Sequence, residues 1–396
     1  MVTFNLSDSV KIVLSNLEAK GFEAFVVGGY VRDLFLGKET HDCDVTTNAK
    51  PNEIEQVFED YKQSHIGKDH GTIGVRVNGE WIEITTYRVD EAILDHRRPK
   101  TVRFSQHLKE DVLRRDFTMN ALALDKKGSV IDFVGGQKDI EAKLIRCVGD
   151  PHLRFDEDAL RILRALRFSA QLMFKIEENS IQAMRAHAPL LRNLAVERIF
   201  QEFQLIFLAP TSSRAFFNGQ GILNHVVPEL EHMSVFDINM LDEFEHALIK
   251  WVICFRESSE KQMQDRLNAL KAPKQFIQDS LSLHHCYHHE FTNDDYALKT
   301  MMKNYPSSIL AMAMDMQMKM QDSIYNVQAH DRMSDLIEYK VCVSIKDLAI
   351  DGYDLMRFGI HGKHIQMNLE KALEGVMRDQ VVNSKAELLA WLNLTS

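Results

Sequence analysis

An apolar run that stops at two adjacent glycines constrains the fold of this chain more than any other feature. Residues 24–27 predict a short buried strand, which ends at Gly28 and Gly29. Adjacent glycines let the backbone turn tightly and let an anionic group lie against bare amides. Arg32 then opens a helical segment, and the positive end of a helix stabilises phosphate. This order predicts a phosphate-binding turn formed by Gly28, Gly29 and Arg32.

Two carboxylates follow on the next extended segment. Asp42 and Asp44 are two residues apart, so on a strand both side chains point to one face. Paired oxygen ligands beside a bound phosphate suit Mg²⁺ that bridges a nucleoside triphosphate and an attacking hydroxyl. A surface turn with two solvated aspartates would explain this pair alone, but not the glycines and the arginine before it. We therefore predict Asp42 and Asp44 as the catalytic residues and metal ligands.

Three later segments add charged side chains. Residues 114–121 place two arginines before an apolar stretch, and Arg115 is predicted to bind triphosphate because a planar guanidinium forms paired hydrogen bonds with it. Residues 155–168 carry an arginine at every third position from Arg161 onward and predict a single helix. Glu83 lies in a segment where polar and apolar residues alternate as in a strand. It is equally well interpreted as a third carboxylate at the site or as a structural strand residue.

These motifs, in this order and spacing, resemble the class II tRNA nucleotidyltransferases, namely the CCA-adding enzymes of Gram-positive type and their poly(A) polymerase relatives. The resemblance covers roughly residues 20–205. It implies template-independent addition of C, C and A to the 3′ end of tRNA from CTP and ATP, with Mg²⁺ as cofactor. An A-adding-only enzyme or a poly(A) polymerase of the same family remains the alternative. A non-catalytic RNA-binding protein is opposed by the intact aspartate pair and by the matching arginines.

The arginine-rich helix is also the predicted base-reading element. Asp158 and Arg161 are three residues apart, which on a helix places them on one face. Cytosine and adenine present an amino donor beside an unprotonated ring nitrogen, so a carboxylate and a guanidinium match both bases and mismatch U and G. Arg164 and Arg167 are predicted to reach the triphosphate or the neighbouring carboxylates. The alternative is a solvated helix face with alternating charge.

The predicted fold class is α+β, with a small β-sheet in an N-terminal head and helices after it. Short apolar runs alternate with helical stretches up to a turn near residue 150, and strand signals nearly vanish beyond Asp156. We predict a catalytic nucleotidyltransferase head at 1–150, a helical neck with the base-reading helix at 151–210, a helical body at 211–305 and a tRNA-binding helical tail at 306–396. The predicted strands lie at 24–27, 43–46, 71–77, 81–86, 121–124 and 130–134.

Composition places limits on partners and location. The formal net charge of −10 requires that any RNA-binding surface be a local patch on an acidic body. No apolar run is long enough to cross a membrane, the first residues do not resemble a secretory signal, and five scattered cysteines suit a reducing compartment. We therefore expect a cytoplasmic enzyme without a membrane partner. A homodimer is left open.

The C-terminal part contributes weaker signals. A glycine-rich approach to a helix start at Lys363 resembles the tail of Gram-positive CCA-adding enzymes, which implies a grip on the tRNA elbow while the acceptor end reaches the head. The histidine tract at 284–289 is interpreted as a solvent-exposed helix face rather than a metal site. His330 and Asp331 are too isolated to predict a phosphatase, and the methionines within 312–320 are expected to fill helix packing.

The polar segment at 90–104 bears on the product. Its Asp95, Arg97, Arg98 and Pro99 match the flexible loop of CCA-adding relatives, which CC-only members lack. The alternative is an ordinary charged surface loop. The match favours full CCA addition, or A addition alone, over CC addition, and the likeness of the tail counts against poly(A) synthesis.

Overall fold

The computed structural model describes residues 3–39, 43–89, 103–320 and 326–394. Asp42 and most of the predicted loop at 90–104 lie outside these ranges. The chain divides into two compact units, Met1–Asp242 and Glu243–Ser396, which are described separately. No helix of the described residues is both long and apolar enough to cross a membrane.

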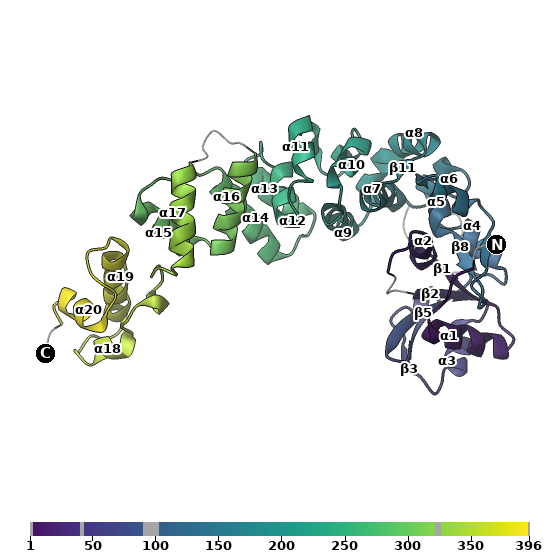
Figure 1. Cartoon of the computed structure of the whole chain (residues 1–396), viewed down its shortest axis with the longest axis horizontal. Coiled ribbons are helices and arrows are strands. Elements are labelled where there is room, and N and C mark those ends of the chain that lie inside the picture. Colours follow the sequence, from purple (N-terminus) through teal and green to yellow (C-terminus); the bar gives the residue numbers. More distant parts are fainter. Residues whose placement is uncertain (1–2, 40–42, 90–102, 321–325, 395–396) are drawn as a thin grey trace. The chain divides into compact units, whose positions relative to one another are not determined.

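The first unit contains a seven-stranded mixed sheet in the order β3-β4-β5-β2-β1-β8-β9 (Figure 1). β2 and β5 are parallel, and the other neighbours are antiparallel. All six predicted strands are confirmed to within a few residues, and the edge strand β3 was missed because its Lys62-Gln63-Ser64 sequence carries no apolar pattern. The strands are β1 (Ala24–Val27), β2 (Cys43–Thr47), β3 (Lys62–Ser64), β4 (Thr72–Val77), β5 (Glu80–Thr86), β8 (Leu122–Leu124) and β9 (Val130–Asp132). Shorter pairs are β6 (Arg88–Val89) with β7 (Arg103–Phe104), and β10 (Leu144–Ile145) with β11 (Lys175–Ile176).

Helices cover the sheet and continue beyond it. α1 (Asp8–Ala19) packs on β1 and β2 through an apolar stripe with Val10, Val13 and Leu17 buried, and α3 (Pro51–Val57) packs on β4 and β5. α2 (Gly29–Phe35) contacts β1 and β8. The remaining α-helices of this unit are α4 (Leu108–Leu113), α5 (Gly136–Glu141), α6 (Pro151–Glu157), α7 (Leu160–Leu172), α8 (Glu178–His187), α9 (Val196–Phe207), α10 (Ser212–Asn218) and α11 (Val235–Met240). Its 3₁₀ turns are η1 (Lys68–His70), η2 (Thr118–Asn120), η3 (Ala188–Asn193), η4 (Leu223–His225) and η5 (Pro228–His232).

The single helix predicted for residues 155–168 is wrong. α6 ends at Glu157 and α7 begins at Leu160, because Asp158 adopts an extended conformation with φ −148° and ψ 99°. Its carboxylate accepts a hydrogen bond from the amide of Leu160 at 3.0 Å. An aspartate in this position satisfies one of the amides that a helix start leaves unpaired. The same bond therefore stabilises the break between the two helices.

All regular elements in the described residues of the second unit are helices, as expected for the body and tail. Its helices are α12 (Ala247–Cys254), α13 (Glu260–Ala269), α14 (Lys274–Tyr287), α15 (Asp295–Asn304), α16 (Ser307–Lys319), α17 (Val327–Glu338), η6 (Ile345–Asp347), α18 (Gly352–Met356), α19 (Lys363–Met377) and α20 (Lys385–Trp391). A separate apolar cluster around Leu355, Leu373 and Leu388 joins α18, α19 and α20. The four-part domain division stays a prediction.

The predicted solvent face for the histidine tract is wrong for His284. This residue is 4% exposed, and its Nε2 lies 3.2 Å from the carbonyl oxygen of Phe255, because this side of α14 packs against α12. His330 is also buried and contacts the side-chain oxygen of Gln317 at 2.8 Å. The packing role of the methionines is confirmed for Met314, Met316 and Met320, which are buried, whereas Met318 is exposed.

Candidate functional site

Three residues that the sequence assigns to the site converge at the end of β1. Gly28 follows that strand with φ +80°, a backbone conformation that residues with a side chain rarely adopt. A Cβ atom placed on Gly28 would lie 3.4 Å from Oδ2 of Asp44 and 3.5 Å from Nη1 of Arg115. Glycine is therefore required by the turn, and its missing side chain leaves space between a carboxylate and a guanidinium.

Strand pairing places a second carboxylate next to Asp44. Asp44 pairs with Val27 on the antiparallel strand β1 and with Glu83 on the parallel strand β5. Asp44 and Glu83 are both exposed, whereas the residues on either side of each of them are buried. Because directly paired residues point to the same sheet face, the two carboxylates lie side by side. Of the two interpretations that the sequence left open for Glu83, this position beside Asp44 favours the third carboxylate, and its role is not tested.

Three of the assigned arginines surround one aromatic ring that sequence reasoning missed. The guanidinium carbons of Arg32, Arg164 and Arg167 lie 5.3, 5.4 and 4.6 Å from the ring centroid of Phe168. Phe168 is 7% exposed, and its ring meets that of Phe117 edge-on at 5.8 Å. A ring face attracts cations, so Phe168 holds these side chains together at the junction of α2 and α7. The sequence signal that could have identified Phe168 is its position directly after Arg167, at the end of the arginine-rich segment.

A largely buried acid ties the head to the arginine-rich helix. Asp116 accepts hydrogen bonds from Nε and Nη2 of Arg164 at 2.9 and 2.6 Å, and from the amide of Phe117 at 2.8 Å. Asn120 donates to the same carboxylate at 3.3 Å and accepts from Nη1 of Arg32 at 2.9 Å. Burial opposes the charged form, but Arg164 and these donors hold the pKa of Asp116 below its ordinary value. Asp116 and Asn120 belong to the motif that the sequence singled out only for its arginines.

Arg167 meets a buried acid, Glu202. Its Nε lies 3.4 Å from a carboxylate oxygen of Glu202 on α9. Burial raises the pKa of Glu202 and lowers the pKa of Arg167, because each charge loses its water. Glu202 was not predicted as a site residue, since nothing in the sequence relates α9 to α7.

The expected neighbourhood of Asp158 and Arg161 on one helix face is wrong, because Asp158 precedes α7. Arg161 is 8% exposed and donates from Nη2 to the backbone oxygen of Arg114 at 2.9 Å. Asp158 lies 3.8 Å from a guanidinium nitrogen of Arg198 on α9. The base-reading role of Asp158 and Arg161 stays a prediction.

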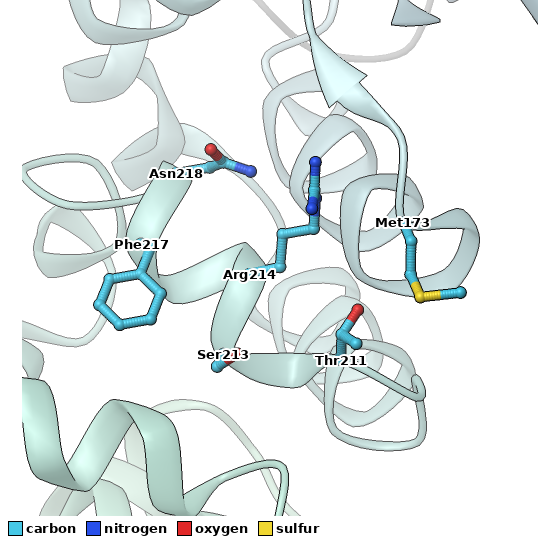
Figure 2. A pocket seen from close by; sticks show the side chains of 6 residues that line it. All are labelled: Met173, Thr211, Ser213, Arg214, Phe217 and Asn218. Atoms are coloured by element: carbon cyan, nitrogen blue, oxygen red, sulfur yellow. The ribbon is translucent and has the colours of Figure 1, made fainter. Parts of the chain in front are cut away.

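A pocket of about 450 Å³ lies apart from these residues. Its lining side chains come from the end of α7 and from α10 with the residue before it, as Figure 2 shows. They are Met173, Thr211, Ser213, Arg214, Phe217 and Asn218. None of the residues assigned from the sequence lines this pocket.

Comparison with known proteins identifies the family. A family model of the "Poly A polymerase head domain" matches residues 24–146, and a model of domain 2 of tRNA nucleotidyltransferases matches 242–392. Between them, 173–233 match a model called "Probable RNA and SrmB- binding site of polymerase A", a range that includes the pocket of Figure 2. The CCA-adding enzyme of Staphylococcus saprophyticus is 32% identical over 99% of both chains. This chain belongs to the CCA-adding enzyme family.

Other members support the same assignment. The CCA-adding enzyme of Lactobacillus helveticus is 48% identical over 204 residues, an alignment that spans about half the length of that enzyme, 51%, and 52% of this chain. The crystal structure of the Bacillus stearothermophilus CCA-adding enzyme in complex with CTP matches with a TM-score of 0.81 and 26% identity, over 97% of this chain and 96% of that one. Family membership and the match to this structure confirm the predicted α+β fold.

Proposed function

We propose that this enzyme adds C, C and A to the 3′ end of tRNA, using CTP and ATP and releasing pyrophosphate. The observation that carries the proposal is the convergence of Gly28, Asp44 and Arg115 around one open position at the edge of β1 and β2. A carboxylate, a guanidinium and a glycine backbone are the groups that a metal-bound triphosphate needs. The similarity to an enzyme whose structure contains CTP supports the nucleotide class.

The residues present fit a divalent metal ion, and we propose Mg²⁺. Asp44 and Glu83 offer exposed carboxylate oxygens on one sheet face, and the absent side chain of Gly28 leaves room beside Asp44. Asp42 and Asp44 would hold two ions, in keeping with the preference of Mg²⁺ for oxygen ligands. When bound, Mg²⁺ lowers the pKa of the attacking 3′-hydroxyl and neutralises the departing pyrophosphate.

The side chains then orient the nucleotide for in-line displacement. The 3′-hydroxyl oxygen of the tRNA attacks the α-phosphorus of the nucleotide. The bond between this phosphorus and the oxygen that bridges to the β-phosphate breaks, so pyrophosphate leaves, and the hydroxyl proton passes to solvent. Gly28, Gly29, Arg32 and Arg115 hold the triphosphate, with Arg164 and Arg167 beside it. Arg32 is already oriented, because it forms a double hydrogen bond with Asp33 at 2.9 Å and donates to Asn120. Asp158 and Arg161 select the base.

The second unit supplies the proposed grip on the tRNA elbow. Lys363 begins α19 and is exposed, and Tyr353 and Phe358 just before it are 74% and 37% exposed. Exposed aromatic rings beside basic side chains suit stacking on bases and contact with phosphate. The cytoplasmic location stays a prediction. Light scattering coupled to size-exclusion chromatography would decide between a monomer and the homodimer that the sequence left open.

Extension assays on tRNA transcripts that end before C, C or A test the proposal with single labelled nucleotides. Asp44→Ala should abolish incorporation of both C and A while tRNA binding and the fold persist. Asp69→Ala, a change of another exposed carboxylate in the head, serves as the matched control and should retain parent activity. Incorporation above a few per cent of the parent rate in Asp44→Ala would refute the catalytic assignment.

A further inference from the structure

Asp111 is a buried acid that gathers donors from three segments of the head. Its side chain has no exposed surface. Oδ1 accepts from Nε and Nη2 of Arg114 at 2.9 and 2.6 Å and from the amide of Arg88 at 3.4 Å. Oδ2 accepts from Nη2 of Arg115 at 3.1 Å and from the hydroxyl of Thr46 at 3.4 Å. One carboxylate therefore joins α4, β2 and the start of β6.

The charge of Asp111 is maintained by its arginines. Burial opposes ionisation, but Arg115 and Arg114 hold the pKa of this carboxyl below its ordinary value. The spacing explains the contact, because Arg114 and Arg115 follow Asp111 by three and four residues at the end of α4, where such side chains are neighbours. Asp111 thus remains a charged acceptor inside the head.

Arg115 spans the distance between this acid and the open position at Gly28. Its Nη2 is held by Asp111, while its Nη1 lies beside the point where a Cβ of Gly28 would be. Its Nε is buried and has no hydrogen-bond partner within the described part of the chain. The side chain is 18% exposed, so the guanidinium is fixed at one end and available at the other.

Asp111 also reaches the predicted base-reading helix. Asp111 accepts two hydrogen bonds from the side chain of Arg114. The backbone oxygen of Arg114 in turn accepts a hydrogen bond from Arg161 on α7. Thr46, which donates to Asp111, lies two residues beyond Asp44 on β2 and therefore on the same sheet face. Asp111 therefore contacts β2 and the end of α4, two elements that carry predicted residues of the site.

We propose that Asp111 is a positioning residue for nucleotide binding, which acts by fixing the guanidinium of Arg115 toward the space left by Gly28. The proposal rests on the proposed function, since it assumes that Arg115 binds the triphosphate. A triphosphate is common to CTP and ATP, so the effect of Asp111 must be the same for both nucleotides. It must also leave the choice of base unchanged.

Steady-state kinetics of Asp111→Asn test this. We expect KM for CTP and for ATP to rise together by about tenfold, the effect of weakening one charge-assisted hydrogen bond, with kcat changed much less. Rejection of UTP should match that of the parent enzyme. Asp139→Asn is the matched control: Asp139 is also buried and paired with an arginine, Arg146, but it does not contact Arg115. This control should lower thermal stability and leave both KM values near the parent values.

A double-mutant cycle with Arg115→Ala separates positioning from general destabilisation. If Asp111 acts through Arg115, Asp111→Asn should cause almost no further rise of KM in the Arg115→Ala background. A KM rise of the same factor in both backgrounds overturns the proposal, as does an unchanged KM in Asp111→Asn alone. An unchanged KM in Arg115→Ala also overturns it, and locates the failure in the proposed role of Arg115.

A conservative variant covers the case in which Asp111→Asn does not fold. Asp111→Glu keeps the charge and displaces the carboxylate by one methylene, so KM should rise by a smaller factor that again disappears in the Arg115→Ala background. If that rise persists in the Arg115→Ala background, Asp111 does not act through Arg115.

Discussion

Removing Asp116 should weaken the first unit more than most single substitutions. Asp116→Ala takes away four hydrogen bonds, two of them from Arg164, and its side chain is only 10% exposed. Breaking a buried ion pair by removing one partner costs about 3–5 kcal/mol. Arg164 keeps 34% of its side chain exposed, so water relieves part of its unpaired charge. We therefore expect the lower value, about 3 kcal/mol.

Thermal and urea unfolding measure this loss. For a unit of this size about 3 kcal/mol corresponds to a fall in Tm of roughly 6–12 °C. Because the cost comes from the charge left behind, the double variant Asp116→Ala/Arg164→Ala should recover about 1 kcal/mol relative to Asp116→Ala. A single variant within about 0.5 kcal/mol of the parent, or a double variant that is no more stable than the single one, would contradict the reasoning.

Three further predictions concern acid stability, base choice and product. The pKa values of Asp111 and Asp116 are lowered in the folded enzyme, so their contribution to stability is complete above the unfolded pKa of 3.8 and is lost as the pH falls toward the folded pKa. Urea unfolding should therefore show a lower free energy of unfolding at pH ~3 than at pH ~6, and Asp116→Ala should make this difference smaller. Asp158→Ala should impair use of CTP and ATP together, and reversing the donor and acceptor character of Asp158 and Arg161 should relax rejection of UTP and GTP. An unchanged nucleotide preference in Asp158→Ala would place base recognition elsewhere. Deletion of residues 92–100, which lie outside the described residues, should leave two cytidines added and block the terminal adenosine, whereas normal A addition would exclude the lever role of the loop.

Local patterns were sufficient to predict the part of the site that the backbone forms. The apolar run of β1, the tight turn at Gly28 and the spacing of the aspartates at β2 are properties of neighbouring residues, and each was predicted from the sequence. Glu83 was harder, because its position beside Asp44 depends on the pairing of β2 with β5. Strand pairing is a tertiary property, so the sequence could only leave its two interpretations open.

The missed residues are those whose role depends on distant partners. Asp111, Asn120 and Glu202 resemble ordinary polar residues in the sequence and become informative only when Arg115, Arg32 and Arg167 lie against them. The break at Asp158 was missed for a different reason. The threefold spacing of the arginines suggested one continuous helix, although an aspartate two residues before Leu160 is itself a helix-start signal.

The pairing of the site arginines shows how an enzyme with a net charge of −10 can carry several arginines at one site. Arg32 is paired with Asp33, Arg115 with Asp111, Arg164 with Asp116 and Arg167 with Glu202. The structure therefore does not present these arginines as an unbalanced positive surface, and a count of charges along the chain cannot reveal them. Each acid fixes the direction of a guanidinium before the nucleotide arrives, which lowers the cost of ordering it on binding. A triphosphate entering such a balanced site still needs positive charge beyond that of the paired arginines, and a divalent ion on the aspartates would supply it.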